Sequence, residues 1–163
     1  MSRFRGRAGQ AVLAGAMVLL LAGCSSMLST ENWKKLLYSG DKLQQVSILA
    51  ASDVNSGYPV ALDLLLVTDQ KVFDALSALR ATEWFAGKAD FIRQHQKKLF
   101  VQSWELVPGQ NFADVPMPFE ATGTVGTLVF ADYPGERSYR SVVQHQKSVL
   151  IRLGRDDFDV VAD

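Results

Sequence analysis

The segment Val60–Val67 (VALDLLLV) constrains the fold more than any other, because it offers apolar side chains to both faces of a strand. Successive side chains of a strand alternate between two faces. One face therefore holds Val60, Leu62, Leu64 and Leu66, and the other holds Ala61, Asp63, Leu65 and Val67. We expect a strand that is buried on its first face. Its second face should be partly covered, and the residues that follow can supply that cover.

Several other short segments have the alternation or β-branched content of strands. They are residues 43–50, 99–107, 126–131, 139–144, 148–153 and 158–161. Residues 132–136 (DYPGE) predict a hairpin between two of them, and residues 154–157 (GRDD) predict a second hairpin. Residues 112–119 are rich in proline, so we expect an irregular edge there.

The spacing of apolar residues becomes helical after Thr68 and Asp69, either of which can cap a helix. We expect two short helices over residues 69–95, with Gly87 as a possible break. Since each half-apolar sheet must bury its face, the pattern predicts a mainly β protein: a two-layer β-sandwich with this helical insertion between its second and third strands.

The N-terminus predicts a lipoprotein signal peptide over residues 1–23. Arg3, Arg5 and Arg7 precede an uncharged stretch that is too short for a permanent span. Leu21-Ala22-Gly23-Cys24 matches a lipobox, so we expect cleavage between Gly23 and Cys24. Cys24 would then carry an N-acyl chain and an S-diacylglycerol. The alternatives are a simple membrane anchor and an ordinary secretion signal.

Cys24 is the only cysteine, so the folded domain has no thiol left for a disulfide and must be stabilised by packing. Residues 24–40 are expected to form a lipidated tether and residues 41–163 a single domain. Ser25 follows the modified cysteine, and in lipoproteins this resembles the sorting signal for the outer membrane. The mature chain has a formal net charge of about minus 3, which argues against nucleic-acid binding.

Catalytic and metal sites have little support in the sequence. His95 and His145 occur in identical Gln-His-Gln-Lys strings without a third ligand at a suitable spacing, so we interpret both as polar connections. Asp156, Asp157 and Asp159 lack the pattern of a calcium loop and are interpreted as a solvated turn. No serine lies in a Gly-x-Ser-x-Gly motif. We expect neither an enzyme nor a cofactor beyond the lipid. Trp84 and Trp104 are expected in the core, whereas Trp33 could face the membrane or the domain.

The order of several short motifs resembles the TssJ family, the outer-membrane lipoproteins of type VI secretion systems. After the lipobox come Ala-Ser-Asp-Val-Asn (51–55), Trp-Phe-Ala-Gly-Lys-Ala-Asp-Phe (84–91) and Val-Pro-Gly-Gln (107–110). The resemblance implies a transthyretin-like sandwich and no catalysis. It also implies a location on the periplasmic face of the outer membrane, where the protein binds the periplasmic part of TssM in a complex that includes TssL.

The resemblance further implies that partner contact comes largely from the connection between the first two strands. Here those residues are Ser52, Asp53, Val54, Asn55, Ser56, Gly57, Tyr58 and Pro59. Family members often have a longer connection, so this chain resembles a divergent member with a smaller contact area. The alternative is a periplasm-facing lipoprotein that binds a small ligand or another envelope protein. A hydrolytic enzyme would need a polar cluster in a cleft.

Overall fold

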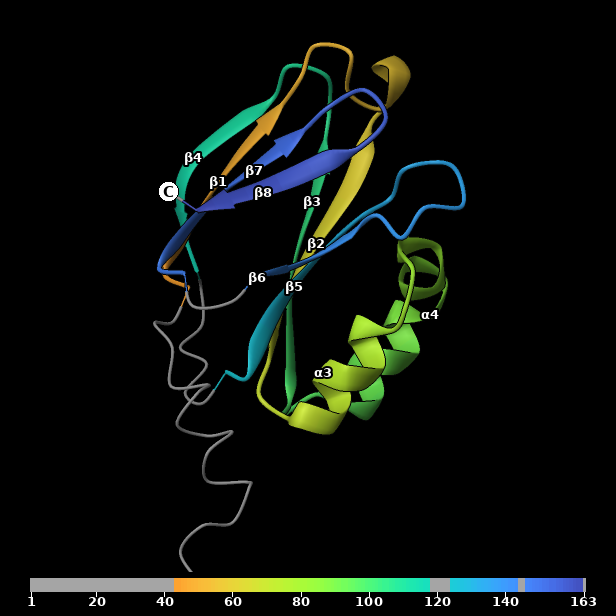
Figure 1. Ribbon diagram of the computed structural model, residues 1–163, viewed down its shortest axis with the longest axis vertical. Coiled ribbons are helices and arrows are strands. Elements are labelled where there is room, and N and C mark those ends of the chain that lie inside the picture. Colours follow the sequence, from red (N-terminus) through yellow and green to blue (C-terminus); the bar gives the residue numbers. More distant parts are fainter. Residues whose placement is uncertain (1–42, 118–123, 144–145, 163) are drawn as a thin grey trace, which may run out of the picture. The chain divides into compact units, whose positions relative to one another are not determined.

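Eight strands and two helices make up the part of the chain that the computed structural model describes, namely residues 43–117, 124–143 and 146–162 (Figure 1). The strands are β1 (Gln45–Ala50), β2 (Val60–Val67), β3 (Leu99–Leu106), β4 (Asn111–Pro116), β5 (Gly126–Ala131), β6 (Arg140–Val143), β7 (Ser148–Leu153) and β8 (Phe158–Ala162). The helices are α3 (Gln70–Ser77) and α4 (Ala81–Gln94), and a short 3₁₀ turn, η1 (Val54–Gly57), follows β1.

The strands form two four-stranded sheets. Sheet A has the order β4-β1-β7-β8, and sheet B has the order β3-β2-β5-β6. All neighbours are antiparallel except β1 and β7, which run parallel. Both predicted hairpins are confirmed, as β5 pairs with β6 and β7 pairs with β8. The predicted mainly β fold, with two sheets and helices between β2 and β3, is also confirmed.

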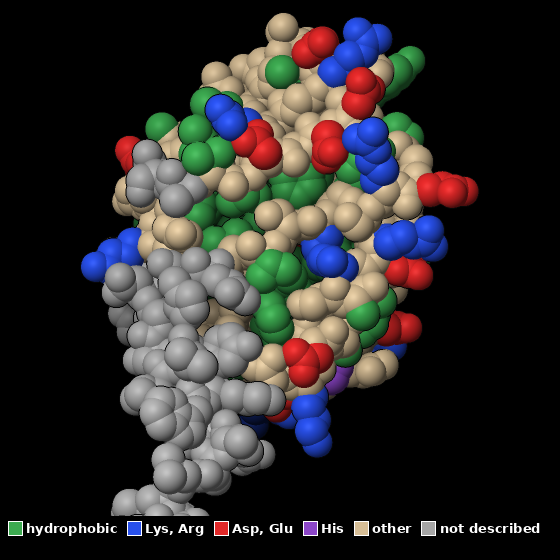
Figure 2. All heavy atoms as spheres, in the orientation of Figure 1, with side chains coloured by type: hydrophobic (Ala, Val, Ile, Leu, Met, Phe, Trp, Pro, Cys, Tyr) green, Lys and Arg blue, Asp and Glu red, His purple; other side chains and the backbone are tan. Residues whose placement is uncertain are grey.

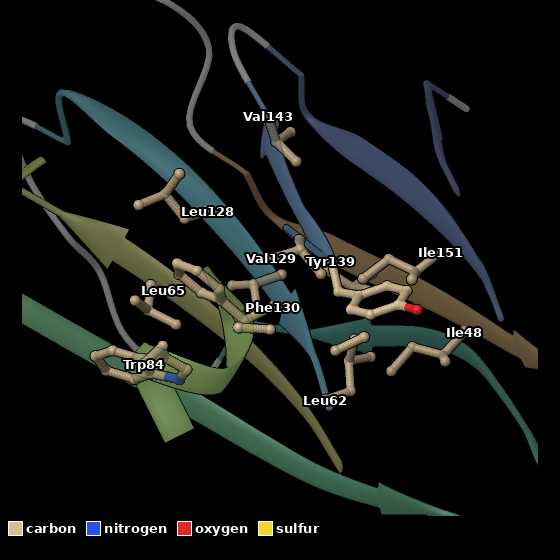
Figure 3. Close-up of a cluster of buried hydrophobic side chains, with 14 of the residues drawn as sticks. Ile48, Leu62, Leu65, Trp84, Leu128, Val129, Phe130, Tyr139, Val143 and Ile151 are labelled. Carbon is tan, nitrogen blue, oxygen red and sulfur yellow. The ribbon is translucent and has the colours of Figure 1, made fainter. Parts of the chain in front are cut away.

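Strand β2 lies in the middle of sheet B and is buried on both faces, whereas its sequence predicts a buried first face and a partly covered second face. Leu62 lies with Ile48 and Ile151 in the core between the sheets (Figure 3). Leu64 shares the face of Leu62 and is also fully buried. The opposite face carries Leu65, which is also fully buried. Helices α3 and α4 cover that face, and Trp84 of α4 stacks on Phe130 of β5 with 5.6 Å between ring centroids. Sheet B is therefore the middle of three layers.

The two helices form where the sequence predicts, but the second has no break at Gly87. The side chain of Asp69 caps α3 by accepting bonds from the N–H groups of Lys71 (3.1 Å) and Val72 (3.2 Å). The chain then interrupts the helix at residues 78–80, before α4. Gly87 lies inside α4, where the ring of Phe91 packs beside it. The possible break at Gly87 does not occur, because one glycine costs a helix interior only about 1 kcal/mol relative to alanine, too little to end this fourteen-residue helix.

The proline-containing segment is an edge strand with one irregularity. Strand β4 pairs with β1, but the register slips between Val46 and Ile48 of β1. On β4, Asp114 adopts a φ of 48°, and its N–H donates to the hydroxyl of Ser47. Pro116 lies at the end of the strand, where a missing N–H does least harm. Residues 118 and 119 of the predicted edge lie outside the described residues.

The predicted signal peptide and tether, with Gly23, Cys24 and Trp33, also lie outside the described residues, as does His145. Trp84 is fully buried, which confirms it as a core residue, whereas Trp104 is half-buried and packs against the core from its edge. Within the described ranges, no helix is both long and apolar enough to cross a membrane.

Candidate functional site: the loop end of the sandwich

Four connections gather at one end of the sandwich, which we call the loop end. They are residues 51–59 (β1 to β2), 107–110 (β3 to β4), 132–139 (β5 to β6) and 154–157 (β7 to β8). Backbone hydrogen bonds tie them together. The N–H of Ala51 donates to Leu153 O (2.9 Å), and the N–H of Gly109 donates to Ala51 O (3.0 Å). The Tyr133 hydroxyl also donates to Gly154 O (2.8 Å). The loop end is thus a connected surface.

The connection from β1 to β2, which carries the predicted partner residues, has an unusual and well-supported backbone. Asn55 (φ 47°) and Ser56 (φ 55°) both adopt the left-handed conformation, and Gly57 follows at φ 91°. Residues other than glycine remain in the left-handed conformation only when surrounding contacts stabilise it. The N–H groups of Asn55 and Ser56 donate to Gly154 O (3.4 Å) and Arg155 O (3.2 Å). The Asn55 side-chain amide also donates to Pro59 O (2.8 Å). The loop is therefore held in one shape.

The predicted residues differ in their accessibility. Val54 is fully buried and fixes the loop to the core, and Asn55 is half-buried by the contacts described above. The other predicted residues are exposed: Ser52, Asp53, Ser56, Gly57, Tyr58 and Pro59. Tyr58 has 71% of its surface exposed, which is unusual for an aromatic side chain. The accessible part of the predicted segment is therefore centred on Tyr58.

The connection between β3 and β4 is not among the predicted partner residues, although the bond from the Gly109 N–H to Ala51 O joins it to the β1–β2 connection. The last pair of the β2–β3 ladder is Val60 with Leu106. Pro59 and Val107 are the next residues of the two connections, at the point where the strands end. Val107 is 49% exposed. The Pro108-Gly109 pair did predict a turn, but only the strand pairing reveals which loop it adjoins.

Charged side chains of both signs surround this apolar surface, with acidic ones in excess. Exposed at the loop end are Asp53, Asp132, Glu136, Asp156 and Asp157, together with Arg137 and Arg155. Figure 2 shows red, blue and green side chains mixed at the upper end of the molecule. Burial raises the pKa of Asp132 above its usual value, with Lys88 lowering it and the charge of Asp63 raising it. The surface suits contact with a basic protein.

A buried polar cluster lies nearby, beneath α4, and its groups bond to one another. The Asp63 carboxylate accepts from Trp84 Nε1 (2.8 Å) and from Lys88 Nζ (3.1 Å). Asp63 is the polar residue that interrupts the apolar second face of β2, and its side chain is 1% exposed. These bonds join α4 to sheet B. We interpret the cluster as part of the fold.

The other polar groups that the sequence singled out have ordinary structural partners. His95 ends α4, and its carbonyl accepts from the N–H groups of Lys98 and Leu99. Asp157 pairs with Arg137, and Asp159 pairs with Arg152. Among the described residues, no three His, Cys, Asp or Glu side chains come together as metal ligands.

Comparison with known proteins relates the fold to one class of structure. No protein-family model matches the sequence, and no curated protein matches it. The solved TssJ1 lipoprotein of the type VI secretion system (T6SS) of Pseudomonas aeruginosa aligns with 75% of this chain and 98% of its own, at 18% identity and a TM-score of 0.54.

Two further solved structures are similar to this chain. A structure described as a type VI membrane complex aligns with 74% of this chain and 99% of its own, at 16% identity and a TM-score of 0.56. One chain of a structure described as the C-terminal domain (869–1107) of the T6SS protein TssM from EAEC aligns with 74% of this chain and with 98% of its own length, at 16% identity and a TM-score of 0.54. The described domain therefore has the fold of a TssJ lipoprotein.

Proposed function

We propose that this chain is a TssJ-type outer-membrane lipoprotein, which anchors a type VI secretion complex by binding the periplasmic part of TssM through its loop end. The observation that carries the proposal is the fold shared with the TssJ1 lipoprotein over nearly its full length. The lipobox around Cys24, which the sequence contains independently of the fold, supports the same function. TssL would belong to the same complex through TssM.

The direction of β1 suits a tether. The described domain begins at Leu43, next to β1, and β1 then runs to the loop end. A strand rises by about 3.3 Å per residue, so roughly 20 Å separates the ends of this six-residue strand. A chain lipidated at Cys24 would enter the domain at the end opposite the loops. The loop end would then be free to meet a protein that reaches across the periplasm.

A small-ligand site between the sheets is the less favoured function. Residues of the core between the sheets, such as Ile48, Leu64 and Ile151, have no exposed surface. A ligand-binding lipoprotein needs a preformed apolar pocket with a few converging polar groups. A shallow surface depression does lie where β1, β7 and β8 reach the loop end, but its Arg152 and Asp159 side chains pair with each other. The geometry favours protein binding.

Co-purification with TssM tests the proposed function. The full-length lipidated protein, solubilised in detergent, is passed over the immobilised periplasmic domain of the TssM encoded in the same genome. We expect the wild type to be retained and a variant lacking residues 56–58 to be retained less, because the deletion removes the left-handed turn and Tyr58. Circular dichroism of the deletion variant checks that its fold is intact. If neither protein is retained, the proposal is wrong.

A further inference from the structure

Two exposed apolar side chains mark a small patch at the loop end. Tyr58 at 71% and Val107 at 49% are the most exposed large hydrophobic residues in the described part of the chain. They come from different connections, but these connections are held together at two points. Val60 pairs with Leu106 at the end of the β2–β3 ladder, and the N–H of Gly109 donates to Ala51 O (3.0 Å). Pro59 and Val107 therefore follow the last paired residues of two strands that lie about 5 Å apart, with Tyr58 and Pro108 one residue further along each connection. We call Tyr58, Pro59, Val107 and Pro108 the loop-end patch.

Both halves of the loop-end patch have a fixed backbone before any partner arrives. Next to Tyr58, the Asn55 side chain holds Pro59 O at 2.8 Å. On the other half, the N–H of Val107 donates to the side-chain oxygen of Gln110 (3.1 Å), and the N–H of Gln110 returns a bond to Val107 O (3.0 Å). A preorganised surface loses little conformational entropy on binding. An exposed tyrosine on such a surface has the character of an interface hot spot.

Acidic side chains are in excess around the loop-end patch, although the exposed Arg155 also lies nearby, since its carbonyl accepts from the Ser56 N–H (3.2 Å). Asp53 belongs to the same loop as Tyr58, and Glu105 immediately precedes the last paired residue of β3. Asp132 is held beside the start of β2 because its N–H donates to Ala61 O (2.8 Å). All three side chains are exposed. An apolar centre with a negative rim is complementary to a hydrophobic recess bordered by Lys or Arg.

We infer that Tyr58 inserts into such a basic-rimmed recess on the partner, and that the β3–β4 turn supplies contact area that the short β1–β2 loop lacks. This inference rests on the proposed function and specifies how its binding surface works. Binding depends on both the β1–β2 and the β3–β4 connections, each of which passes from one sheet to the other. Val107 therefore contributes although it is about fifty residues from Tyr58 in the sequence.

The test measures affinity for the periplasmic domain of TssM by biolayer interferometry. Variants Tyr58→Ala and Val107→Ser are compared with Val142→Ser, a matched control that is 41% exposed on β6, outside the loop end. We expect Tyr58→Ala to weaken binding by about 30-fold or more, which is the loss typical of a hot spot. Val107→Ser should weaken binding by roughly 5-fold or more, and Val142→Ser by less than about 2-fold. Because all three side chains are exposed, thermal unfolding should match the wild type.

The salt dependence of the association rate tests whether the acidic residues contribute to binding. The wild-type rate should fall as NaCl rises from about 50 to 500 mM, and Glu105→Gln should reduce this dependence. A rate that does not respond to salt would contradict the basic rim of the partner. If the wild type binds but the affinities of Tyr58→Ala and Val107→Ser equal that of Val142→Ser, the inference is overturned. The proposed function would stand in that case. A wild type that fails to bind would overturn the proposed function and this inference with it.

Discussion

At the residue scale, Gly126 shows how closely sheet B meets its helices. A Cβ at this position would lie 2.4 Å from Cε2 of Phe73, whose ring is buried between α3 and the sheet. Because the atoms in the way belong to a buried ring, they cannot simply turn aside. The glycine is required by packing.

We therefore predict that Gly126→Ala destabilises the protein by about 1–3 kcal/mol, the usual cost of overpacking a core. Gly87→Ala is the matched control, since its nearest neighbour would be the Phe91 ring at 3.4 Å and alanine favours a helix interior. It should be neutral or slightly stabilising. Urea unfolding followed by circular dichroism measures both. Equal effects of the two substitutions would contradict the predicted clash.

The pair of Asp63 and Lys88 is a second feature of individual residues. Asp63 is buried and accepts bonds from Lys88 and Trp84, whereas the Lys88 side chain is 36% exposed. Removing Lys88 leaves a buried carboxylate with one donor fewer. Removing the charge of Asp63 leaves an ammonium that can turn toward water.

Lys88→Met should therefore cost more than Asp63→Asn, roughly 2–4 kcal/mol against about 1–2 kcal/mol. The double variant should be more stable than the sum of the single losses implies, because neither charge is then left unpaired. Thermal and urea unfolding of all four proteins give the coupling energy. Strict additivity would mean that the two groups do not stabilise each other.

At the scale of elements, Asp69 joins helix α3 to the start of β3. Its side chain accepts from Lys98 Nζ at 2.7 Å and also caps the first turn of the helix. The bond from Lys98, followed by that from the Val72 N–H, lowers the pKa of Asp69 below its usual 3.8. A carboxyl whose folded pKa is depressed adds stability above its unfolded pKa. That stability is lost as the pH falls through the folded pKa.

Asp69→Asn keeps the capping oxygen but removes the charge. We expect the variant to be less stable than the wild type at pH 7, with the difference shrinking below pH 3.8 and vanishing once the wild-type carboxyl is protonated. Melting temperatures measured from pH 7 to pH 2 follow this change. A difference that persists undiminished at the lowest pH would show that charge is not its cause.

At the scale of the whole molecule, the lipid and the folded domain should be separable. The only thiol is that of Cys24, so no disulfide depends on it. Cys24→Ser should move the protein from the membrane fraction to the soluble periplasmic fraction and leave its melting temperature unchanged. Cell fractionation and unfolding of the purified domain measure the two effects. A Cys24→Ser protein that stays in the membrane pellet would refute the anchor.

Sequence patterns predicted the elements because their cause is local. Alternation along Val60–Val67 reflects the pleat of a single strand, and the change of period after Asp69 reflects the helical repeat. The same patterns suggested a possible break at Gly87, but α4 continues through it, because one glycine costs a helix interior only about 1 kcal/mol relative to alanine. They also gave no indication of the irregularity at Asp114, where the backbone N–H donates to the hydroxyl of Ser47 on another strand.

Local patterns predict most of the strands, both helices, and a β2 strand that is buried on one face and partly covered on the other. The parallel pairing of β1 with β7, the partners of Asp63, and the bond from the Gly109 N–H to Ala51 O that joins two loop connections appear only in the folded chain. The difference follows from the sequence separation over which each kind of interaction acts. Periodicity and capping act within a few residues, whereas strand order and the composition of a surface depend on contacts between segments far apart in the chain.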